Sequence, residues 1–578
     1  MTTLLFIAKH AAVLLLLLVA AAGAGTLVVG SRFGLALRCA LGLAVWGQVL
    51  FFLAAAGQLR GGVILVLLVI AMVGMGRTDR IVCPPLGVVS VGVVMGGALL
   101  LVALQPPLAF DETLYHLPFV RALAESGELR FLGDLRFPVF PQLHELLCVP
   151  LYLLAGDVAT HLVSLAEVAI TAALLFEWGR RYEARAGSLA AALFLGSPLV
   201  VYLSTIGHTD AALTLFVTAG FYCLDRSSFA LAGVFFGCAC SVKYLGGYFA
   251  LAALVLVVLW HRRAVWAFLA GCLAAALPTT IWLIASTGNP VFPFLSSGVW
   301  QLIFKPISLE TRVVRVARVL WDATFAREHT GYSPPITPLL IAAVAIMIAA
   351  ARRDVRARAV AFICAGFLIV YALHPQDSRY LVPLLPLVSI VAAVSVSRTK
   401  LAPWLAAIAI APGVFYAGYR LVVMGMPPAT AAEREAVLRK RIPEYAALMR
   451  AGESRVYVCG GEQLKYYARG QFRGDHFGPF AYRYVLDGAH TTASLAERLR
   501  RIDAQSYLVV KRACPPPQAN GGMELVYEDG AAQLWRVLPG DSRATGESTA
   551  SSNGRICESC LTRMTKSQAR SNFFQPVL

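Results

Sequence analysis

The sequence predicts an α-helical protein that crosses a membrane many times and ends in a small α/β domain outside it. Of the 578 residues, 58% are hydrophobic and only 14% are charged, whereas a soluble domain averages about 25% charged residues. Apolar runs of roughly 18 residues or more, the length that spans a bilayer, recur through residues 1–425. After residue 425 the pattern changes to short alternating segments.

About fourteen apolar runs are interpreted as transmembrane spans. The first lacks a clean small-residue cleavage pattern and is followed by further spans, so we expect a retained helix rather than a cleaved signal. The runs lie near 5–29, 34–57, 60–76, 84–104, 158–178, 186–205, 209–225, 228–242, 244–260, 264–286, 336–351, 357–373, 380–397 and 402–424.

The basic residues indicate the topology of these spans. The net charge of +17 would suggest nucleic acid in a soluble protein, but here the arginines separate alternate spans, so we expect no nucleic-acid partner. By the positive-inside rule their face is cytoplasmic. The opposite face then receives the polar loops 105–157, 204–211, 287–335 and 374–379, and the whole chain after residue 425.

Residues 430–538 are predicted to form the extracytoplasmic α/β domain, because strand-like segments such as "SYLVVKRA" alternate with the helical "TTASLAERLRRID". Cys459 and Cys514 lie in this part, where they can pair. The polar segment 539–578 is expected to be a disordered tail. Its lone CxxC, Cys557 and Cys560, has no second pair to complete a zinc site, and we expect no metal there.

The stretch "LAFDETLYHLPFVRA" at 108–122 opens the first long polar loop and carries the strongest functional signal. Asp111, Glu112, Tyr115 and His116 fall within six positions at the lip of the bilayer. They could simply cap the next helix or bind a loop arginine. Ionisable groups held at membrane depth are costly, however, and are usually functional. A carboxylate here is suited to remove a proton as a general base.

Cations and further polar residues are predicted on the same face. Arg379 can present a bidentate fork to a phosphate, or else anchor the interface or pair with Asp377. Lys243 is either a phosphate ligand or a snorkelling lysine, and Asp210 is either a functional acid or a helix cap. The remaining candidate binding residues are His208, Tyr244, His374, Gln376 and Tyr380.

Within the loop 287–335, Arg312, Arg315 and Arg318 recur at three-residue spacing among valines. This spacing predicts an amphipathic helix at the outer surface of the membrane. Such a helix is either a solvated interfacial face or a surface that attracts an anionic lipid donor.

Several of these segments, in order, resemble one known family. "FDETLYHLPFVRAL", "RFPVFPQLHELL", "TDAALTLF", "KYLGGYFALA" and "RYLVPLLPL" are similar to segments of the C-type, polytopic membrane glycosyltransferases that include bacterial protein O-mannosyltransferases and the aminoarabinose transferase of lipid A. The resemblance covers roughly residues 105–400. It implies an integral membrane enzyme of the bacterial inner or cell membrane, with its active site on the extracytoplasmic face. Such an enzyme moves a hexosyl or pentosyl group from a polyprenyl-phosphate donor to a lipid, glycan or protein of the cell envelope.

The resemblance also implies roles for individual residues. Asp111 would be the general base, and Glu112 would support it or orient the acceptor. Lys243 and Arg379 would hold the donor phosphate. Asp210 falls where some relatives place an acid associated with a divalent cation. It lacks a neighbouring carboxylate, which argues against a metal site here, and the resemblance implies no other cofactor. The four spans before the acidic loop depart from relatives that have one.

Three alternatives remain open from the sequence. A transporter or flippase of lipid-linked sugars would carry charges inside spans and two related halves, a pattern that is not visible here. A polysaccharide ligase or polymerase would be an enzyme with a different loop arrangement. A non-catalytic scaffold would make Asp111 dispensable.

Overall fold

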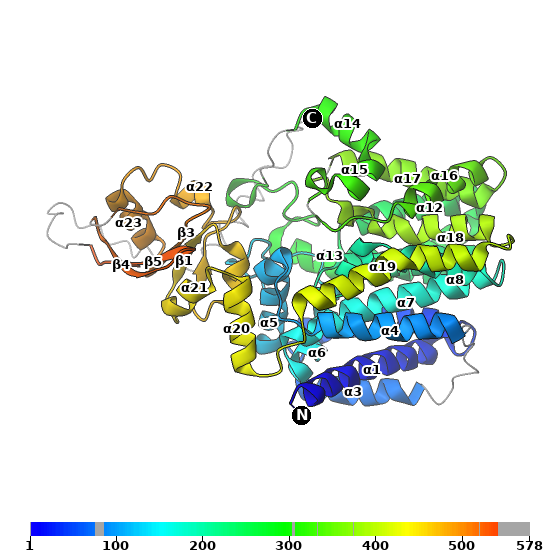
Figure 1. The fold of residues 1–578 in the computed structure, drawn as a ribbon, viewed down its shortest axis with the longest axis horizontal. Coiled ribbons are helices and arrows are strands. Elements are labelled where there is room, and N and C mark those ends of the chain that lie inside the picture. Colours follow the sequence, from blue (N-terminus) through cyan, green and yellow to red (C-terminus); the bar gives the residue numbers. More distant parts are fainter. Residues whose placement is uncertain are drawn as a thin grey trace.

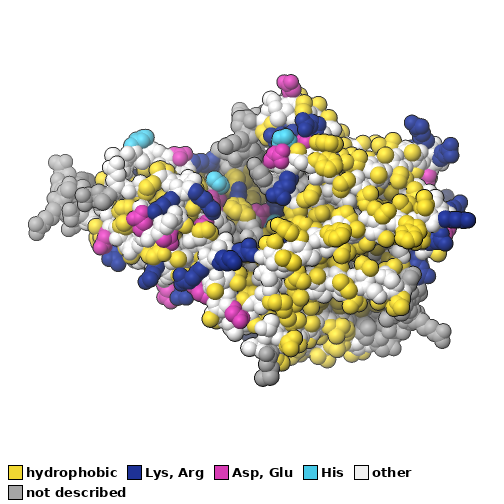
Figure 2. Space-filling model, viewed as in Figure 1, with side chains coloured by type: hydrophobic (Ala, Val, Ile, Leu, Met, Phe, Trp, Pro, Cys, Tyr) yellow, Lys and Arg dark blue, Asp and Glu magenta, His cyan; other side chains and the backbone are white. Residues whose placement is uncertain are grey.

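A bundle of helices and a small five-stranded sheet lie at opposite ends of the molecule (Figure 1). This computed structural model describes residues 2–74, 86–302, 307–331, 333–373, 375–518 and 521–540. The space-filling view shows a broad apolar surface over the bundle, with Lys and Arg side chains gathered at the end farthest from the sheet (Figure 2). That distribution is typical of a protein held in a membrane.

Each of the fourteen expected spans contains helix in the described residues. The helices of the bundle are α1 (Thr2–Val29), α2 (Leu35–Ala55), α3 (Gly61–Val73), α4 (Leu86–Ala103), α5 (Leu117–Ser126), α6 (Leu143–Ala155), α7 (His161–Arg180), α8 (Ala186–Leu195), α9 (Pro198–Leu203), α10 (Asp210–Asp225), α11 (Phe229–Val242), α12 (Gly246–Trp260), α13 (Val265–Thr287), α14 (Leu309–Ala317), α15 (Val319–Phe325), α16 (Leu339–Ala351), α17 (Val355–Leu373), α18 (Leu385–Val396) and α19 (Ala402–Met424).

The count of fourteen spans is not confirmed. Within the described ranges, eight segments are long and apolar enough to cross a membrane, and several other helices, such as α3 and α12, are shorter. The eight are Thr2–Val29, Leu35–Ala55, Leu86–Ala103, Asp157–Arg180, Arg262–Thr287, Val355–Leu373, Ser378–Val396 and Ala402–Met424. The structure also shows α6 inside the region that the sequence analysis treated as a polar loop. Pro150 inside the helix and the polar residues His144 and Glu145 in its first turn interrupt the apolar pattern. This helix was therefore not predicted from the sequence.

Small residues let the extra N-terminal helices pack closely. A Cβ on Gly42 of α2 would lie 1.7 Å from the Ala21 carbonyl oxygen of α1, and one on Gly25 would lie 1.9 Å from the Arg38 carbonyl oxygen. Side chains at these glycines would therefore separate the two helices. Close backbone approach at small residues is the usual means of helix association in a bilayer.

The sheet has strand order β2-β1-β3-β5-β4, formed by β1 (Val456–Cys459), β2 (Phe472–Arg473), β3 (Ser506–Val510), β4 (Met523–Glu528) and β5 (Ala532–Val537). β1 pairs in parallel with β2 and β3, whereas β5 is antiparallel to β3 and β4. The helices around it are α20 (Ala431–Arg441), α21 (Tyr445–Ala451), α22 (Tyr482–Val485) and α23 (Thr492–Arg501), with the 3₁₀ segment η8 (Glu462–Tyr467).

Cys459 and Cys514 form a disulfide across this sheet region, with their Cα atoms 6.1 Å apart. The expected tail lies outside the described residues except for Pro539 and Gly540. Cys557 and Cys560 are likewise outside them.

Polar contacts attach the sheet region to the bundle beside the first polar loop. Arg434 of α20 binds both carboxylate oxygens of Asp157, with Nη1–Oδ1 at 2.8 Å. Tyr467 of η8 donates to the Pro107 carbonyl, and Lys465 donates to the Asp134 carbonyl. The C-terminal region therefore rests directly on the loop that carries Asp111.

We expect Arg434→Gln to loosen this attachment. The Asp157 side chain is only 10% exposed, so removing its partner leaves a largely buried acceptor unpaired at a cost of about 1–3 kcal/mol. Thermal unfolding in detergent should shift down by several degrees, and protease cleavage between α19 and α20 should accelerate. Arg439→Gln is the matched control on the same helix, because its pair with Glu435 is exposed and worth roughly 0.3–0.5 kcal/mol. Equal shifts in the two variants would show that the Arg434–Asp157 pair does not hold the C-terminal region to the bundle.

Candidate active site

A cavity of about 500 Å³ opens at the end of the bundle that faces the sheet region. Five segments contribute its wall: the loop after α4, the end of α9 with the turn that follows it, the loop before α16, the segment after α17, and α19. The lining residues are Phe110, Asp111, Tyr202, Leu203, His208, Arg327, Gly331, Ser333, Pro334, Asp377, Arg379 and Tyr416.

Asp111 stands immediately before a single π-helical turn, η2 (Glu112–His116), which continues into α5. Isolated π turns are frequent at functional sites because they redirect neighbouring side chains. Asp111 Oδ2 lies 2.6 Å from Arg379 Nη1, and its side chain is 15% exposed. The carboxylate is therefore held at the cavity wall by a guanidinium from the other side of the site.

Arg379 is the centre of this cluster. It lies in η7 (Ser378–Leu384), the 3₁₀ turn that opens into α18. Besides Asp111, it contacts Asp377, with Nε–Oδ2 at 3.1 Å, and donates to Nδ1 of His208 at 3.1 Å. Asp377 is itself fixed by accepting hydrogen bonds from Ser333 Oγ at 2.9 Å and from the Arg379 backbone N–H at 3.0 Å.

This charge arrangement keeps Asp111 ionised and His208 neutral. Burial alone would raise the pKa of Asp111, but the positive charge of the neighbouring Arg379 guanidinium outweighs it and holds that pKa below its usual range. Burial, followed by the Arg379 charge, lowers the pKa of His208 to about 3. The cavity thus presents a carboxylate, a neutral imidazole and a guanidinium at physiological pH.

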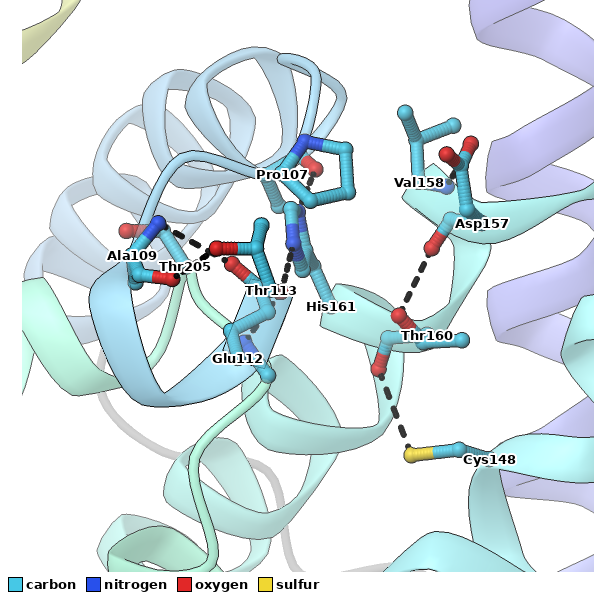
Figure 3. A network of polar contacts seen from close by, with 12 residues as sticks. Pro107, Ala109, Glu112, Thr113, Cys148, Asp157, Val158, Thr160, His161 and Thr205 are labelled. Carbon is cyan, nitrogen blue, oxygen red and sulfur yellow. Dashed lines mark hydrogen bonds and ion pairs between the residues drawn. The ribbon is translucent and has the colours of Figure 1, made fainter. Parts of the chain in front are cut away.

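Glu112 points away from the cavity. Its carboxylate, 0% exposed, contacts His161 Nε2 and accepts hydrogen bonds from the Gly207 N–H at 2.8 Å and the Ala109 N–H at 3.4 Å (Figure 3). A Cβ at Gly207 would lie only 2.6 Å from Glu112 Oε1. These contacts hold the acidic turn against α7 and the turn before α10, so Glu112 supports the position of Asp111.

Tyr115 and His116 form the layer behind Asp111. The Tyr115 ring packs edge-on against Phe137 and Phe140, with centroids 5.0 and 5.7 Å away. Burial raises the pKa of Tyr115 well above its ordinary value. His116 Nδ1 lies 2.5 Å from Glu145 Oε1 of α6.

The second cation, Lys243, lies near the site but is already paired. Its Nζ donates to Asp210 Oδ1 at 2.7 Å and sits 4.6 Å from the centre of the Tyr380 ring. Tyr244 donates to the Phe292 carbonyl and so packs against the loop before α14. Gln376 is buried, with both side-chain amide atoms lacking a hydrogen bond to any described residue. His374 lies outside the described residues.

Sequence reasoning missed several residues of the site, among them Arg327, Tyr202 and Tyr416. Arg327 follows Arg312, Arg315 and Arg318 in the loop 287–335, and it lines the cavity, as do Tyr202 and Tyr416. The two tyrosines look like ordinary apolar-helix residues in sequence. The sequence did carry one signal. Arg327 shortly precedes Gly-Tyr-Ser-Pro-Pro at 331–335, a segment that ends the helical pattern.

The predicted amphipathic helix itself is divided at Arg318 into α14 and α15. Arg312 donates to the Ala372 carbonyl at 2.6 Å, while Leu309 and Trp321 are 76% and 56% exposed. An apolar face exposed beside arginines is typical of a membrane-surface segment. Among the described residues, no group of three or more His, Cys, Asp or Glu side chains is arranged to hold a metal ion.

Comparisons with known proteins address the membrane part first. Residues 151–282 match the family model described as dolichyl-phosphate-mannose-protein mannosyltransferase. The crystal structure of ArnT from Cupriavidus metallidurans in the apo state superposes with a TM-score of 0.51 at 15% sequence identity, covering 78% of this chain and 96% of ArnT. The structure of ArnT bound to undecaprenyl phosphate has the same identity and coverage and a TM-score of 0.48.

The chain shares the fold of ArnT. The family match at residues 151–282 lies within the region, residues 105–400, where sequence segments indicated the resemblance. The expected fold class, a polytopic helical protein with a small C-terminal sheet, is confirmed apart from the number of spans.

The C-terminal region has a separate family match, and the chain also matches one curated relative over part of its length. Residues 433–536 match a family model described as SF2091/S2213. An uncharacterized protein of Shigella flexneri, SF2093/S2215, is 36% identical over 121 residues, which are 20% of this chain. The chain covers about 60% of that relative's length.

We expect Arg379→Gln to raise the pKa of the Asp111 carboxyl, because the guanidinium is the charge that chiefly offsets the burial of this group. Infrared titration of the carboxyl band, with Asp111→Asn subtracted to assign it, should show protonation at higher pH than in the wild type. Arg420→Gln is the control, since this second arginine near the cavity binds Thr205 rather than Asp111. An Asp111 band that titrates identically in wild type and Arg379→Gln would refute the assignment.

Proposed function

We propose that the protein is a membrane glycosyltransferase that moves a sugar from a polyprenyl-phosphate donor to an extracytoplasmic acceptor, with Asp111 as general base. The observation that carries this proposal is the direct contact of Asp111 and Arg379 at the wall of one cavity. The C-type fold and the family match at residues 151–282 support the reaction class.

The chemistry needs only these two kinds of group. The acceptor's oxygen or nitrogen attacks the anomeric carbon, the bond from that carbon to the phosphate oxygen breaks, and Asp111 takes the acceptor's proton. The polyprenyl phosphate leaves as a phosphate anion, so no acid catalyst is required. Arg379 and Arg327 supply the positive charge that stabilises the leaving group, as fixed cations do at other phosphate sites.

Donor binding would also activate the base. Without donor, Arg379 is engaged by Asp111 and Asp377. A donor phosphate competes for the same guanidinium, and weakening the contact to Asp111 raises the pKa of that carboxylate and makes it a stronger base. Lys243, held by Asp210 and Tyr380, is proposed as a second donor contact, and Gln376 as a hydroxyl-binding side chain for the sugar.

We further propose that residues 1–425 form the transferase module, that residues 430–538 form an extracytoplasmic domain, and that the site faces away from the cytoplasm of a bacterial inner membrane. The Cys459–Cys514 disulfide supports this orientation, because disulfides persist in oxidising compartments. Exposed arginines at 352–358 and 398, on the opposite end of the bundle, agree with the positive-inside rule.

Purified protein in lipid nanodiscs should release polyprenyl phosphate from at least one of a panel of polyprenyl-phosphate sugars when envelope extract supplies the acceptor. Asp111→Asn should lower kcat by about 10²–10⁴-fold, the usual contribution of a general base, while donor binding survives because Arg379 keeps its charge. Glu435→Gln, a surface change on α20, is the matched control.

If intact lipid-linked sugar crosses proteoliposomes without release of lipid phosphate, the transporter alternative replaces the transferase. If donor is consumed equally by wild type and Asp111→Asn, the base assignment fails and the transferase class remains.

A further inference from the structure

Two buried histidine–glutamate pairs lie behind the cavity, and the transfer reaction as written uses neither. His116 Nδ1 lies 2.5 Å from Glu145 Oε1, and His144 Nδ1 lies 3.1 Å from Glu167 Oε1. Both carboxylates are 0% exposed. Buried ionisable groups in a membrane bundle are expensive, and replacing such a pair with apolar residues is often neutral or stabilising. Packing alone therefore gives little reason for either pair.

Only one of the pairs borders the active site. His116 ends the turn that begins at Asp111, and the centre of its ring is 5.9 Å from that of His208. His208 lines the cavity and contacts Arg379. His116 lies five residues after Asp111, at the far end of the η2 turn, and the two groups interact electrostatically.

The other pair is turned into the bundle. His144 contacts Glu167 of α7 and, through Nε2, Cys148 Sγ at 3.6 Å. None of these three residues lines the cavity, and the described residues show no hydrogen bond from them to one that does. The pairs are thus alike in chemistry and burial, and successive on α6, but differ in access to the site.

Both pairs and the cavity carry buried polar atoms without a hydrogen-bond partner among the described residues. They are Glu145 Oε2, Glu167 Oε2 and His208 Nε2, so it is the position beside the cavity, and not this feature, that distinguishes the two pairs. A buried polar atom left unpaired costs about 1–3 kcal/mol, and in native proteins such atoms often belong to groups that act in catalysis. An imidazole that donates from one nitrogen to a buried carboxylate is well suited to accept a proton at the other, because the carboxylate stabilises the imidazolium that forms.

We propose that the His116–Glu145 pair receives the proton that Asp111 removes from the acceptor, an inference that rests on the transferase function above. As the acceptor's bond to the anomeric carbon forms and the carbon–phosphate oxygen bond breaks, the proton passes to Asp111. It then moves to Nε2 of His116, while the Nδ1–H bond to Glu145 stays in place. The proton leaves to water after the polyprenyl phosphate departs, which returns Asp111 to its ionised form. Charged and titratable groups near His116 are Asp111 and Tyr115 from the same stretch of chain, Glu145 from α6 and His208 from the turn before α10.

The test compares His116→Gln with the matched control His144→Gln, in nanodiscs, with a polyprenyl-phosphate sugar that the wild type consumes. His116→Gln should lower kcat by about 10–100-fold, leave the donor KM within about threefold of wild type, and raise the solvent deuterium isotope effect on kcat as proton transfer becomes limiting. His144→Gln should keep kcat within about threefold and the isotope effect unchanged. Equal losses of kcat in the two variants, or an unchanged isotope effect in His116→Gln, would overturn the proposal.

A variant that fails to fold is replaced by the double change His116→Leu with Glu145→Leu, which leaves no lone buried charge. If this double variant binds donor and turns over at the wild-type rate, the pair is not a proton acceptor. The transferase assignment fails separately, when the wild type itself consumes no donor.

Discussion

The Asp111–Arg379 ion pair is the contact on which the rest of the site depends. It joins the first outer loop to the turn that opens α18, and neither partner is exposed enough for water to replace the other. Because Arg379 also binds Asp377 and His208, one guanidinium fixes three segments around a single cavity. A buried guanidinium needs several hydrogen-bond and charge partners to offset its loss of water. The same contacts therefore fix the geometry of the site and stabilise this end of the bundle.

Two further sets of contacts hold the loop that carries Asp111 in place. Glu112 ties the acidic turn to His161 and to the Gly207 backbone, and the Arg434–Asp157 contact places the C-terminal region over the same loop. The adjacent carboxylates of Asp111 and Glu112 therefore have different roles. Asp111 faces the cavity, and its neighbour holds the backbone in the π turn that points Asp111 there.

Sequence reasoning identified the parts of the site that depend on charge in an apolar context. Asp111 and Arg379 stand out because few charges interrupt the predicted spans, and alternation of basic loops is enough to place both at one end of the bundle. The separation of Glu112 from the cavity was not predictable, because a π turn changes side-chain directions without any clear sequence signal. Tyr202 and Tyr416 were missed for a related reason, since a cavity-lining tyrosine and a lipid-facing one look alike in an apolar helix.

Helix identity was also easier to predict than span number. Hydropathy locates helices such as α10 and α11, but whether a short helix crosses a bilayer depends on tilt and on neighbours such as α13, which the local pattern does not contain. The helix α6 was not predicted because His144 and Glu145 look too polar for a buried helix. In the structure their partners are Glu167 of α7 and His116 of η2. Only the tertiary structure brings those partners together.

A cryo-electron microscopy map of the protein in nanodiscs with undecaprenyl phosphate would test the central claim most directly. The account predicts phosphate density in the cavity within hydrogen-bond distance of Arg379, with the contact between Arg379 and Asp111 lengthened and the Asp111 carboxylate facing the space left for an acceptor. Phosphate bound elsewhere on the protein, with the Asp111–Arg379 pair unchanged, would contradict it.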